Sequence, residues 1–233
     1  MAKKPPAGKA AGTGGKRKLA VYVKTAKKRS VASAAWLARQ LNDPYVAAAQ
    51  AQGLRSRAAF KLIELDDRYK LLKPGCRVVD LGCAPGGWAQ VAVQRGAARV
   101  VGLDLLFVDP VPGTTLLQGD FNDDTMPATL MAELGGQADI VLSDMAPNTT
   151  GHAATDHLRI IALAELALDF ATKVLAPGGS FVAKVFQGGT EAQMLAPMKR
   201  LFASVRHAKP PASRKESSEL YVVCTGFRGA PGA

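Results

Sequence analysis

The chain has 233 residues, of which 48% are hydrophobic, and its formal net charge is +11. This length suits one domain with room for a tail, and the apolar share excludes a wholly disordered chain. No apolar run approaches the roughly 20 residues of a membrane-spanning helix. The basic N-terminus lacks the apolar core of a secretory signal. We therefore expect a cytoplasmic protein that does not engage a membrane.

Cysteine and histidine usage argues against a metal site. The three cysteines are far apart and odd in number, which excludes a disulfide scaffold and a cysteine-based zinc site and suits a reducing compartment. His152 and His157 are five residues apart, a poor spacing for one helix face, and no metal-ligand motif contains them. We expect no bound metal.

Most of the charge imbalance lies in residues 1–30, which hold ten basic side chains and no acidic one. The other 203 residues hold 20 basic and 19 acidic side chains. The segment is rich in Lys, Pro, Ala and Gly and cannot bury enough apolar surface to fold alone. Counterion release attracts such a tail to nucleic acid; a solubility role and a targeting role are the alternatives. We predict a disordered basic tail over 1–30 and a single domain over 31–233.

The predicted elements begin with two helices. Helical spacing of apolar residues indicates one helix over 31–50 and another over 56–72, which Ser56 caps and Pro74 and Gly75 end. Apolar runs that suit buried strands then follow at 77–81, 99–103, 115–118, 138–142 and 180–186. Helical patterns lie near 87–95, 126–134, 157–175 and 190–203. Two further strands are expected at 204–208 and 220–226.

This order of elements predicts an α/β fold. Alternation of strands and helices is typical of a parallel sheet covered on both faces. The loop over 209–218 is too short and too polar for a crossover helix, so the last two strands should form an antiparallel hairpin. A seven-stranded, mostly parallel sheet that ends in this hairpin is the Rossmann-like arrangement of class I methyltransferases dependent on S-adenosylmethionine (SAM).

A glycine-rich turn follows the first predicted strand, in the segment VDLGCAPGGW over 79–88. Gly82, Gly86 and Gly87 allow a tight turn and the close approach of a ligand. The helix that begins near Trp88 directs free amide groups toward the same space. The spacing is neither the dinucleotide fingerprint GxGxxG nor a P-loop.

Acidic residues end the next two strands. Asp104 lies 22 residues after Gly82, where a carboxylate would accept hydrogen bonds from the hydroxyls of an adenosine ribose. Asp120 ends the third strand and could accept from an exocyclic amine such as that of adenine. The three features meet at one sheet edge and indicate an adenosine cofactor. SAM is favoured over NAD because the loop departs from the dinucleotide fingerprint.

Several charged residues lie within or beside apolar strands, where burying a charge is energetically costly. Asp144 follows an apolar strand, Lys184 lies inside the run FVAKVF, and Glu219 begins the last strand. The edge that gathers these residues is the one where α/β folds bind ligands, and Lys61, on the helix before the sheet, could reach it. Two structural ion pairs, Lys184–Asp144 and Lys61–Glu219, are the alternative to a functional site.

At this point the sequence resembles the FtsJ-type (heat-shock) ribosomal RNA ribose 2′-O-methyltransferases. The resemblance runs from about residue 30 to the end of the chain. It is carried by the segments SRAAFKL (56–62), DLGCAPGGW (80–88), QGDF (118–121), SDMAPN (143–148), AELALDF (164–170), LAPGGSFVAKVFQG (175–188) and SSELYVV (217–223). Cys83 is a departure, since a small residue such as alanine is more familiar there.

The resemblance implies residue roles and a function. The Lys-Asp-Lys-Glu catalytic tetrad of the family falls on Lys61, Asp144, Lys184 and Glu219. Its SAM contacts fall on Gly86, Trp88, Asp104, Asp120 and Asp144, with Gly82 and Gly87 in the same loop. The implied activity is SAM-dependent 2′-O-methylation of a ribose in 23S ribosomal RNA during large-subunit maturation. Compact members resemble the bacterial enzyme that modifies a uridine in the peptidyl-transferase A-loop. A monomer that binds ribosomal RNA is expected.

The proposed chemistry needs a base and exact alignment. The enzyme must align the hydroxyl oxygen, methyl carbon and sulfur, and must remove a proton. A desolvated lysine beside a second cation can accept that proton, which favours Lys184 with Lys61 nearby. Alternatively, Lys184 stays charged and orients the hydroxyl within a coupled set of four groups. A catalytically idle RNA-binding protein of the same fold and an NAD-dependent oxidoreductase are the competing functions.

Overall fold

The computed structural model describes residues 21–23, 25–28, 30–147, 150–187 and 192–229. The chain forms two compact units, Met1–Pro44 and Tyr45–Ala233. Most of the predicted basic tail, residues 1–20, 24 and 29, lies outside the described residues, so the tail stays a prediction. Within the described part of the chain, no helix combines the length and apolar character that crossing a bilayer requires.

The predicted helix over 31–50 is wrong, because the structure has two helices there. A short 3₁₀ turn, η1 (Ala26–Lys28), precedes α1 (Val31–Leu41), and α2 (Pro44–Ala51) follows a break. The break comes at Asn42 and Asp43, because a residue before proline is disfavoured in the helical conformation while proline itself can begin a helix. Asn42 caps α1, and its side-chain oxygen also accepts from the amide of Val21 at 2.8 Å.

The next helix, α3 (Ala59–Tyr69), is shorter at both ends than the predicted 56–72. Ser56 does not cap it: the N-cap position is Ala58, and the buried hydroxyl of Ser56 finds no hydrogen-bond partner among the residues that the structure describes. Tight turns satisfy the first amides instead, as in Ala59 N–H to Ser56 O at 3.2 Å. The helix ends at Lys70, which takes the left-handed conformation at φ 54° and so turns the chain before Leu72.

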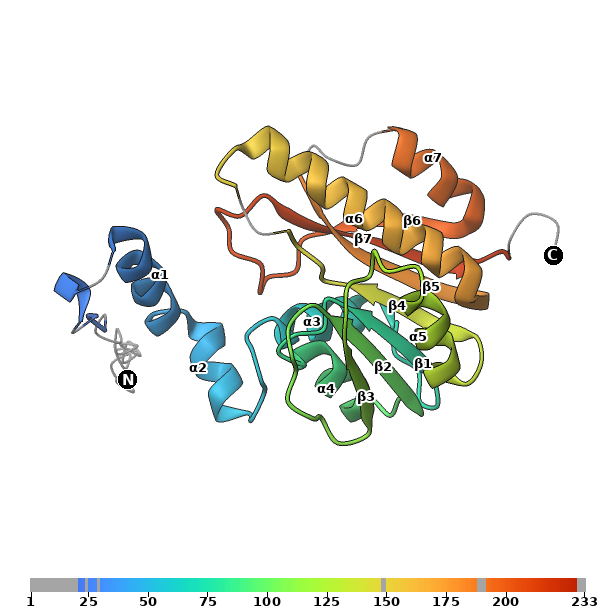
Figure 1. Cartoon of the computed structure of the whole chain (residues 1–233), viewed down its shortest axis with the longest axis horizontal. Coiled ribbons are helices and arrows are strands. Elements are labelled where there is room, and N and C mark those ends of the chain that lie inside the picture. Colours follow the sequence, from blue (N-terminus) through green and yellow to red (C-terminus); the bar gives the residue numbers. More distant parts are fainter. Residues whose placement is uncertain (1–20, 24, 29, 148–149, 188–191, 230–233) are drawn as a thin grey trace, which may run out of the picture. The chain divides into compact units, whose positions relative to one another are not determined.

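The second unit is built on a seven-stranded sheet with the order β3-β2-β1-β4-β5-β7-β6. The strands are β1 (Arg77–Leu81), β2 (Arg99–Asp104), β3 (Thr114–Gln118), β4 (Ala138–Ser143), β5 (Leu175–Phe186), β6 (Phe202–Ala208) and β7 (Glu219–Phe227). The first five strands pair in parallel, and β7 is antiparallel to both β5 and β6. The predicted α/β fold with an antiparallel C-terminal hairpin is confirmed (Figure 1).

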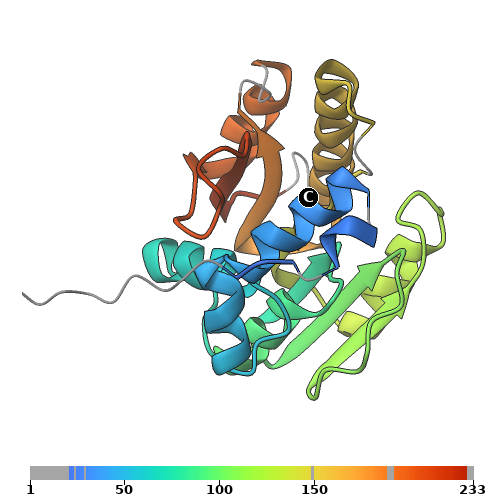
Figure 2. The same cartoon turned by 90° about the vertical axis from the view of Figure 1, so that its left-hand side faces the viewer.

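Helices cover both faces of this sheet (Figures 1 and 2). They are α4 (Gly87–Gln94), α5 (Met126–Leu134), α6 (Ala153–Val174) and α7 (Ala192–Leu201), together with α3. Buried residues of α5, α6 and α7 form one core layer, and those of α3 and α4 form the other. Each layer excludes water from one face, as a parallel sheet requires.

Alternation along the strands decides which layer each side chain enters. On β5, Phe181, Ala183 and Val185 belong to the α5–α6–α7 layer, whereas Val182 belongs to the α3–α4 layer. Lys184 therefore shares the face of Val182. On β7, Tyr221 belongs to the α3–α4 layer as well. The fold thus directs both polar groups toward the side where α3 lies.

Replacing Phe181 with alanine should lower the free energy of unfolding by about 3–5 kcal/mol. The side chain is fully buried, and its ring centroid lies 6.4 Å from that of Phe202, so a cavity would form. Urea denaturation measures the change. The matched control is Leu158→Ala on α6, where the side chain is 68% exposed and should change stability by less than about 0.5 kcal/mol. Equal losses in both variants would contradict this core assignment.

Candidate active site

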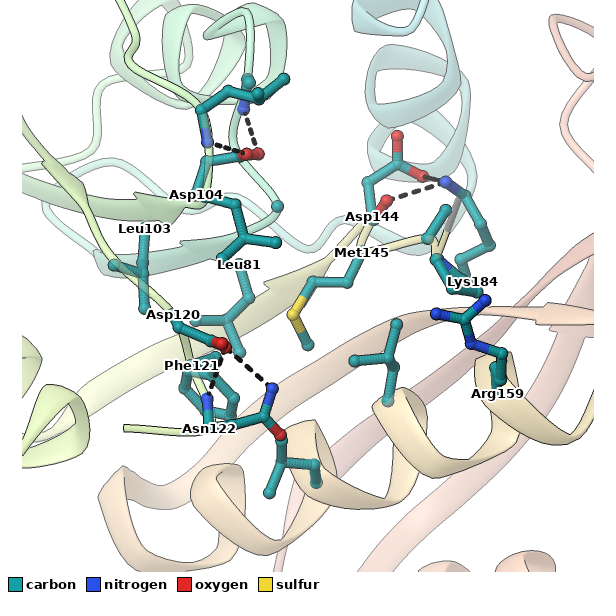
Figure 3. Close-up of a pocket in the computed structure, with 18 of the residues that line it drawn as sticks. Leu81, Leu103, Asp104, Asp120, Phe121, Asn122, Asp144, Met145, Arg159 and Lys184 are labelled. Carbon is teal, nitrogen blue, oxygen red and sulfur yellow. Dashed lines mark hydrogen bonds and ion pairs between the residues drawn. The ribbon is translucent and has the colours of Figure 1, made fainter. Parts of the chain in front are cut away.

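A cleft of about 680 Å³ opens at the carboxyl ends of the central strands (Figure 3). This volume lies in the roughly 300–1,000 Å³ range of small-molecule sites. Of the residues predicted for the site, five line the cleft, namely Gly82, Asp104, Asp120, Asp144 and Lys184. Met145 and Arg159 line it too. The sheet edge predicted from the strand pattern is therefore hollow, and it gathers residues from five strands, β1 to β5, or from the loops that follow them.

Gly82 forms the turn out of β1 at φ 77°, a conformation that other residues rarely adopt. A Cβ atom at this position would lie 2.7 Å from the backbone nitrogen of Met145. The amide of Asp144 donates to Leu81 O at 3.0 Å at the same level. The ends of β1 and β4 are thus held in backbone contact, which sets the floor of the cleft.

Cys83, the departure from the family pattern, fits beside a glycine of β2. Its side chain is buried, and a Cβ atom at Gly102 would lie only 2.9 Å from its Sγ. Burial, followed by the charges of Asp80 and Asp104, raises the pKa of the Cys83 thiol. A protonated, inaccessible thiol supplies packing rather than nucleophilic chemistry.

The two acids of the neighbouring strands lie across the cleft from Lys184 (Figure 3). The carboxylate of Asp104 accepts from the amides of Ala84 and Leu106, each at 2.9 Å. Asp120 Oδ1 accepts from the amide and the side-chain nitrogen of Asn122, at 2.9 and 2.8 Å. These bonds fix the orientation of both groups, and each carboxylate retains lone pairs for a ligand.

Asp144 and Lys184 form a close pair on the opposite wall. Lys184 Nζ lies 2.8 Å from Asp144 Oδ1 and also donates to the backbone oxygen of Asp144 at 2.8 Å. Their side chains are only 17% and 9% exposed, respectively. The pairing follows from register, since Ser143 is the partner of Ala183 in the parallel β4–β5 pair. The next residue along each chain segment is Asp144 or Lys184, so the two charged residues lie side by side.

Tyr221 links this pair to the second one. Its hydroxyl donates to Asp144 Oδ1 at 2.6 Å and accepts from Lys61 Nζ at 3.2 Å. Lys61 Nζ in turn lies 2.7 Å from Glu219 Oε2. The register of β5 and β7 makes Tyr221 the direct cross-strand partner of Lys184. The four predicted residues are thus joined through a fifth in one continuous hydrogen-bonded chain, hereafter the Lys–Tyr–Asp chain.

Several of the predicted residues do not reach the cleft. Lys61 and Glu219 lie behind Tyr221, and Gly86, Gly87 and Trp88 are absent from the lining. The indole nitrogen of Trp88 donates to Ala58 O at 2.8 Å, and its ring centroid lies 5.7 Å from that of Tyr221. Trp88 therefore supports the Lys–Tyr–Asp chain from behind. A contact with a cofactor would use the backbone of this loop.

Opposed effects set the charge of Asp144. Burial raises the pKa of its carboxyl, but the charges of Lys184 and Lys61 and the hydrogen bonds from Lys184 and Tyr221 outweigh it and hold the pKa below the ordinary value. For Tyr221, burial and then the charges of Asp144 and Glu219 raise the pKa well above its usual range. Asp144 is thus an anion and Tyr221 a neutral donor at neutral pH.

Asp80 is a further acidic residue near the cleft, and the sequence did not predict it as a site residue. It is fully buried on β1, and neither of its oxygens has a well-aligned hydrogen-bond partner among the described residues. Burial, with the charges of Asp144 and Asp104, raises the pKa of Asp80 to about 8 against 3.8 in water, despite the favourable amide of Ala89. Three carboxyl groups therefore interact around the turn that follows β1.

Sequence reasoning missed Tyr221, Asp80 and Arg159. A signal existed for Tyr221, because it stands two residues after Glu219 and so shares its face of a strand. Asp80 stands in the quoted segment DLGCAPGGW, yet its burial depends on α4. Arg159 lies within a helical pattern, and only the position of α6 brings it to the cleft. Across the described ranges, no three His, Cys, Asp or Glu side chains are grouped to hold a metal ion.

Comparison with known proteins identifies similar chains. The model of the FtsJ-like methyltransferase family matches residues 54–227. "Ribosomal RNA large subunit methyltransferase E" of Granulibacter bethesdensis is 74% identical over 92% of this chain and 93% of its own length. The protein of the same name from Gluconobacter oxydans is 68% identical over 91% of this chain and 79% of its own length. A Plasmodium falciparum structure described as a ribosomal RNA methyltransferase is 32% identical, with a TM-score of 0.67, and covers 76% of this chain and 100% of its own.

Replacing Tyr221 with phenylalanine should break the Lys–Tyr–Asp chain without removing a charge. We expect a loss of about 1–3 kcal/mol in the free energy of unfolding, since a buried carboxylate oxygen loses a donor. Misalignment of Asp144 and Lys184 should lower kcat by up to about 100-fold. The control is Tyr45→Phe, which removes a 3.0 Å hydrogen bond to Glu64 that is not part of the Lys–Tyr–Asp chain. This variant should leave kcat unchanged. Equal kcat in the two variants would exclude a role for the link.

Replacing Asp80 with asparagine should change the dependence of stability on pH. Between about pH 4 and 8 the folded wild-type protein keeps a proton on Asp80 that the unfolded chain has released. Folding therefore takes up a proton, and the free energy of unfolding falls as the pH rises through this window. Urea denaturation at pH 5 and pH 8 should show a smaller decline in Asp80→Asn. An identical decline would show that Asp80 is ionised in the folded protein.

Proposed function

Because this chain belongs to the FtsJ-like methyltransferase family, we propose that it transfers the methyl group of SAM to a ribose 2′-hydroxyl of 23S ribosomal RNA. The expected target is a uridine of the peptidyl-transferase A-loop, modified during large-subunit maturation. The names of the relatives support ribosomal RNA of the large subunit as the substrate. The 2′-hydroxyl and the uridine rest on the resemblance of the sequence motifs.

The observation that carries the proposal is the distribution of charge around the cleft. Asp104 and Asp120 line one side, and Asp144 lies opposite. SAM carries positive charge on its sulfonium and its ammonium group, so carboxylates favour it. The pyrophosphate of NAD would be repelled. Gly82 and Ala84, which have no side chain or a small one, line the cleft beside these acids and leave room for a bound adenosine derivative.

We assign the cofactor to the acids that line this side and to the backbone of the glycine-rich turn beside them, of which only Gly82 and Ala84 line the cleft. Asp104 would hold the ribose hydroxyls of SAM, Asp120 the amine of its adenine, and the backbone of Gly82, Gly86, Gly87 and Trp88 its methionine part. Asp144 would face the methionine part from the other wall. SAM supplies an electrophilic methyl group when it is bound, and no metal is needed to activate that group.

The remaining chemistry belongs to the Lys–Tyr–Asp chain. A ribose hydroxyl is a weak nucleophile, and it must lose its proton as the new bond forms. Lys184 is the lysine of the tetrad that lines the cleft. In the neutral form, Nζ accepts the proton of the hydroxyl; in the charged form, it orients the hydroxyl oxygen. Asp144 fixes the position of Nζ, and Lys61, Tyr221 and Glu219 hold Asp144 in turn.

The experiment that tests the proposal uses labelled SAM. Large ribosomal subunits and naked 23S rRNA are prepared from a strain that lacks the protein, and each is incubated with the enzyme. A 2′-O-methyl group blocks alkaline cleavage after the modified nucleotide, because that cleavage needs a free 2′-hydroxyl. We expect one labelled, alkali-resistant position. Label on a base, or no transfer at all, would contradict the proposal, and the second result would favour an idle RNA-binding protein.

Two variants should separate chemistry from cofactor binding. Lys184→Ala should abolish methyl transfer and leave the dissociation constant for SAM within a few-fold. Asp104→Ala should weaken SAM binding by about 1–3 kcal/mol through the loss of charge-assisted hydrogen bonds. Calorimetric titration measures binding, with NAD as the matched ligand that should not bind. Near-normal turnover of Lys184→Ala, or unchanged SAM affinity of Asp104→Ala, would remove that residue from the site.

A further inference from the structure

We propose that Arg159 binds a backbone phosphate of the RNA next to the target ribose. This inference deepens the proposed function and rests on it, because it takes RNA as the substrate of the cleft. The residue lies on α6, which contributes no member of the predicted tetrad. It supplies the substrate polymer, rather than the cofactor, with a charged contact inside the cleft.

The position of Arg159 places it at the substrate end. It lines the same cleft as Lys184, and its guanidinium group lies beside that lysine, across from Asp104 and Asp120 (Figure 3). If the adenosine occupies the side of the two acids, the methyl group must point toward Lys184. A guanidinium on this side therefore meets the methyl acceptor, and it stands apart from the glycine-rich turn.

Arg159 has one acidic neighbour on its own helix. Asp156 lies three residues earlier on α6, where side chains of a helix are neighbours. The amide and hydroxyl of Thr150 donate to Asp156 at 2.8 and 2.7 Å. These bonds, and to a smaller extent the charge of Arg159, lower the pKa of the Asp156 carboxyl. The carboxylate of Asp156 is thus engaged by Thr150, and the place of Arg159 in the lining of the cleft lets it meet an anion there.

The chemistry of RNA identifies that anion. In an RNA chain the 2′-hydroxyl is on the carbon next to the one that carries the 3′-phosphodiester. When the 2′-oxygen is aligned at Lys184, the 3′-phosphate is the nearest negative charge of the substrate. A guanidinium matches two phosphate oxygens with parallel N–H donors, whereas the compact ammonium of lysine does not. The contact would require a polynucleotide and would be indifferent to the base.

A carboxylate is the other anion that this cleft could receive, since SAM carries one on its methionine part. The two sources make different demands. A carboxylate contact would affect affinity for SAM and would be independent of RNA. A phosphate contact would affect affinity for RNA and would make that affinity depend on salt, because each neutralised phosphate releases counterions.

The test compares wild type with Arg159→Gln, which removes the charge and keeps a polar side chain, and with Arg159→Lys, which keeps the charge. The control is Lys173→Ala, which removes a cation near the other end of α6, where it pairs with Asp169 at 2.6 Å. Binding of naked 23S rRNA without the methyl group is measured between 50 and 200 mM salt. Circular dichroism confirms folding of each variant. Calorimetry gives the dissociation constants for SAM and for decarboxylated SAM.

We expect Arg159→Gln to bind RNA about tenfold more weakly and to lower the slope of log K against log salt by about 0.7–1. Arg159→Lys should restore the slope, and Lys173→Ala should match wild type. SAM affinity should stay within twofold in all variants. An unchanged slope in Arg159→Gln would overturn the inference. So would weaker binding of SAM, but not of decarboxylated SAM, because that result would assign the arginine to the carboxylate.

The alkali-resistance experiment keeps this inference separate from the proposed function. If wild type forms the 2′-O-methyl group while Arg159→Gln keeps the full salt slope, the function stands and the phosphate contact is wrong. If the slope falls as expected but the label appears on a base, Arg159 still binds phosphate and the assigned reaction fails. If Arg159→Gln does not fold, the dissociation constants of Arg159→Lys for SAM and for RNA provide the test. A loss of SAM affinity in Arg159→Lys overturns the inference. A several-fold loss of RNA affinity with unchanged SAM affinity supports it.

Discussion

Two lysines removed from water are the constraint on which the site depends. Lys61 and Lys184 are each about nine-tenths buried, and an isolated buried cation would cost several kcal/mol. Each needs a carboxylate within ion-pair distance, and the two carboxylates come from different strands. The antiparallel insertion of β7 between β5 and β6 brings Glu219 and Tyr221 to the edge of the sheet where Asp144 follows β4. The topology of the C-terminal hairpin thus supplies Glu219 as the ion-pair partner of Lys61 and places Tyr221 against Asp144, the partner of Lys184.

The surrounding loop serves the same requirement. Ser213 donates to the second oxygen of Glu219 at 2.7 Å, and the amide of Ala212 donates to Glu64 on α3 at 2.7 Å. Arg57 completes the contact by donating to the carbonyl of Ala212. These bonds join the β6–β7 loop to the helix that carries Lys61. These contacts of the loop, made by the buried residues Ala212 and Ser213, therefore help to fix the distance between α3 and β7.

The fold could be predicted from the sequence wherever burial on both faces produced continuous apolar runs, as in β1, β2 and β4. The hairpin was predictable because 209–218 could not hold a crossover helix. Boundaries set by local geometry were harder: Pro44 divides the first predicted helix, and tight turns replace Ser56 as a cap. For the site, residues at strand ends were predictable, since strand direction alone brings them together. Asp80 and Arg159 were not, because their surroundings come from helix packing that no local pattern records.

The position of Glu219 and Tyr221 on the last described strand has a consequence for biosynthesis. A nascent chain emerges N-terminus first, and its early strands can begin to pair while synthesis continues. The cleft walls from β1 to β5 could form at that stage, but Lys61 would then have no carboxylate and Asp144 no tyrosine donor. Strand β6, at the edge of the sheet, pairs only with β7 and must wait as well. A growing polypeptide therefore lacks the complete Lys–Tyr–Asp chain until β7 has left the exit tunnel.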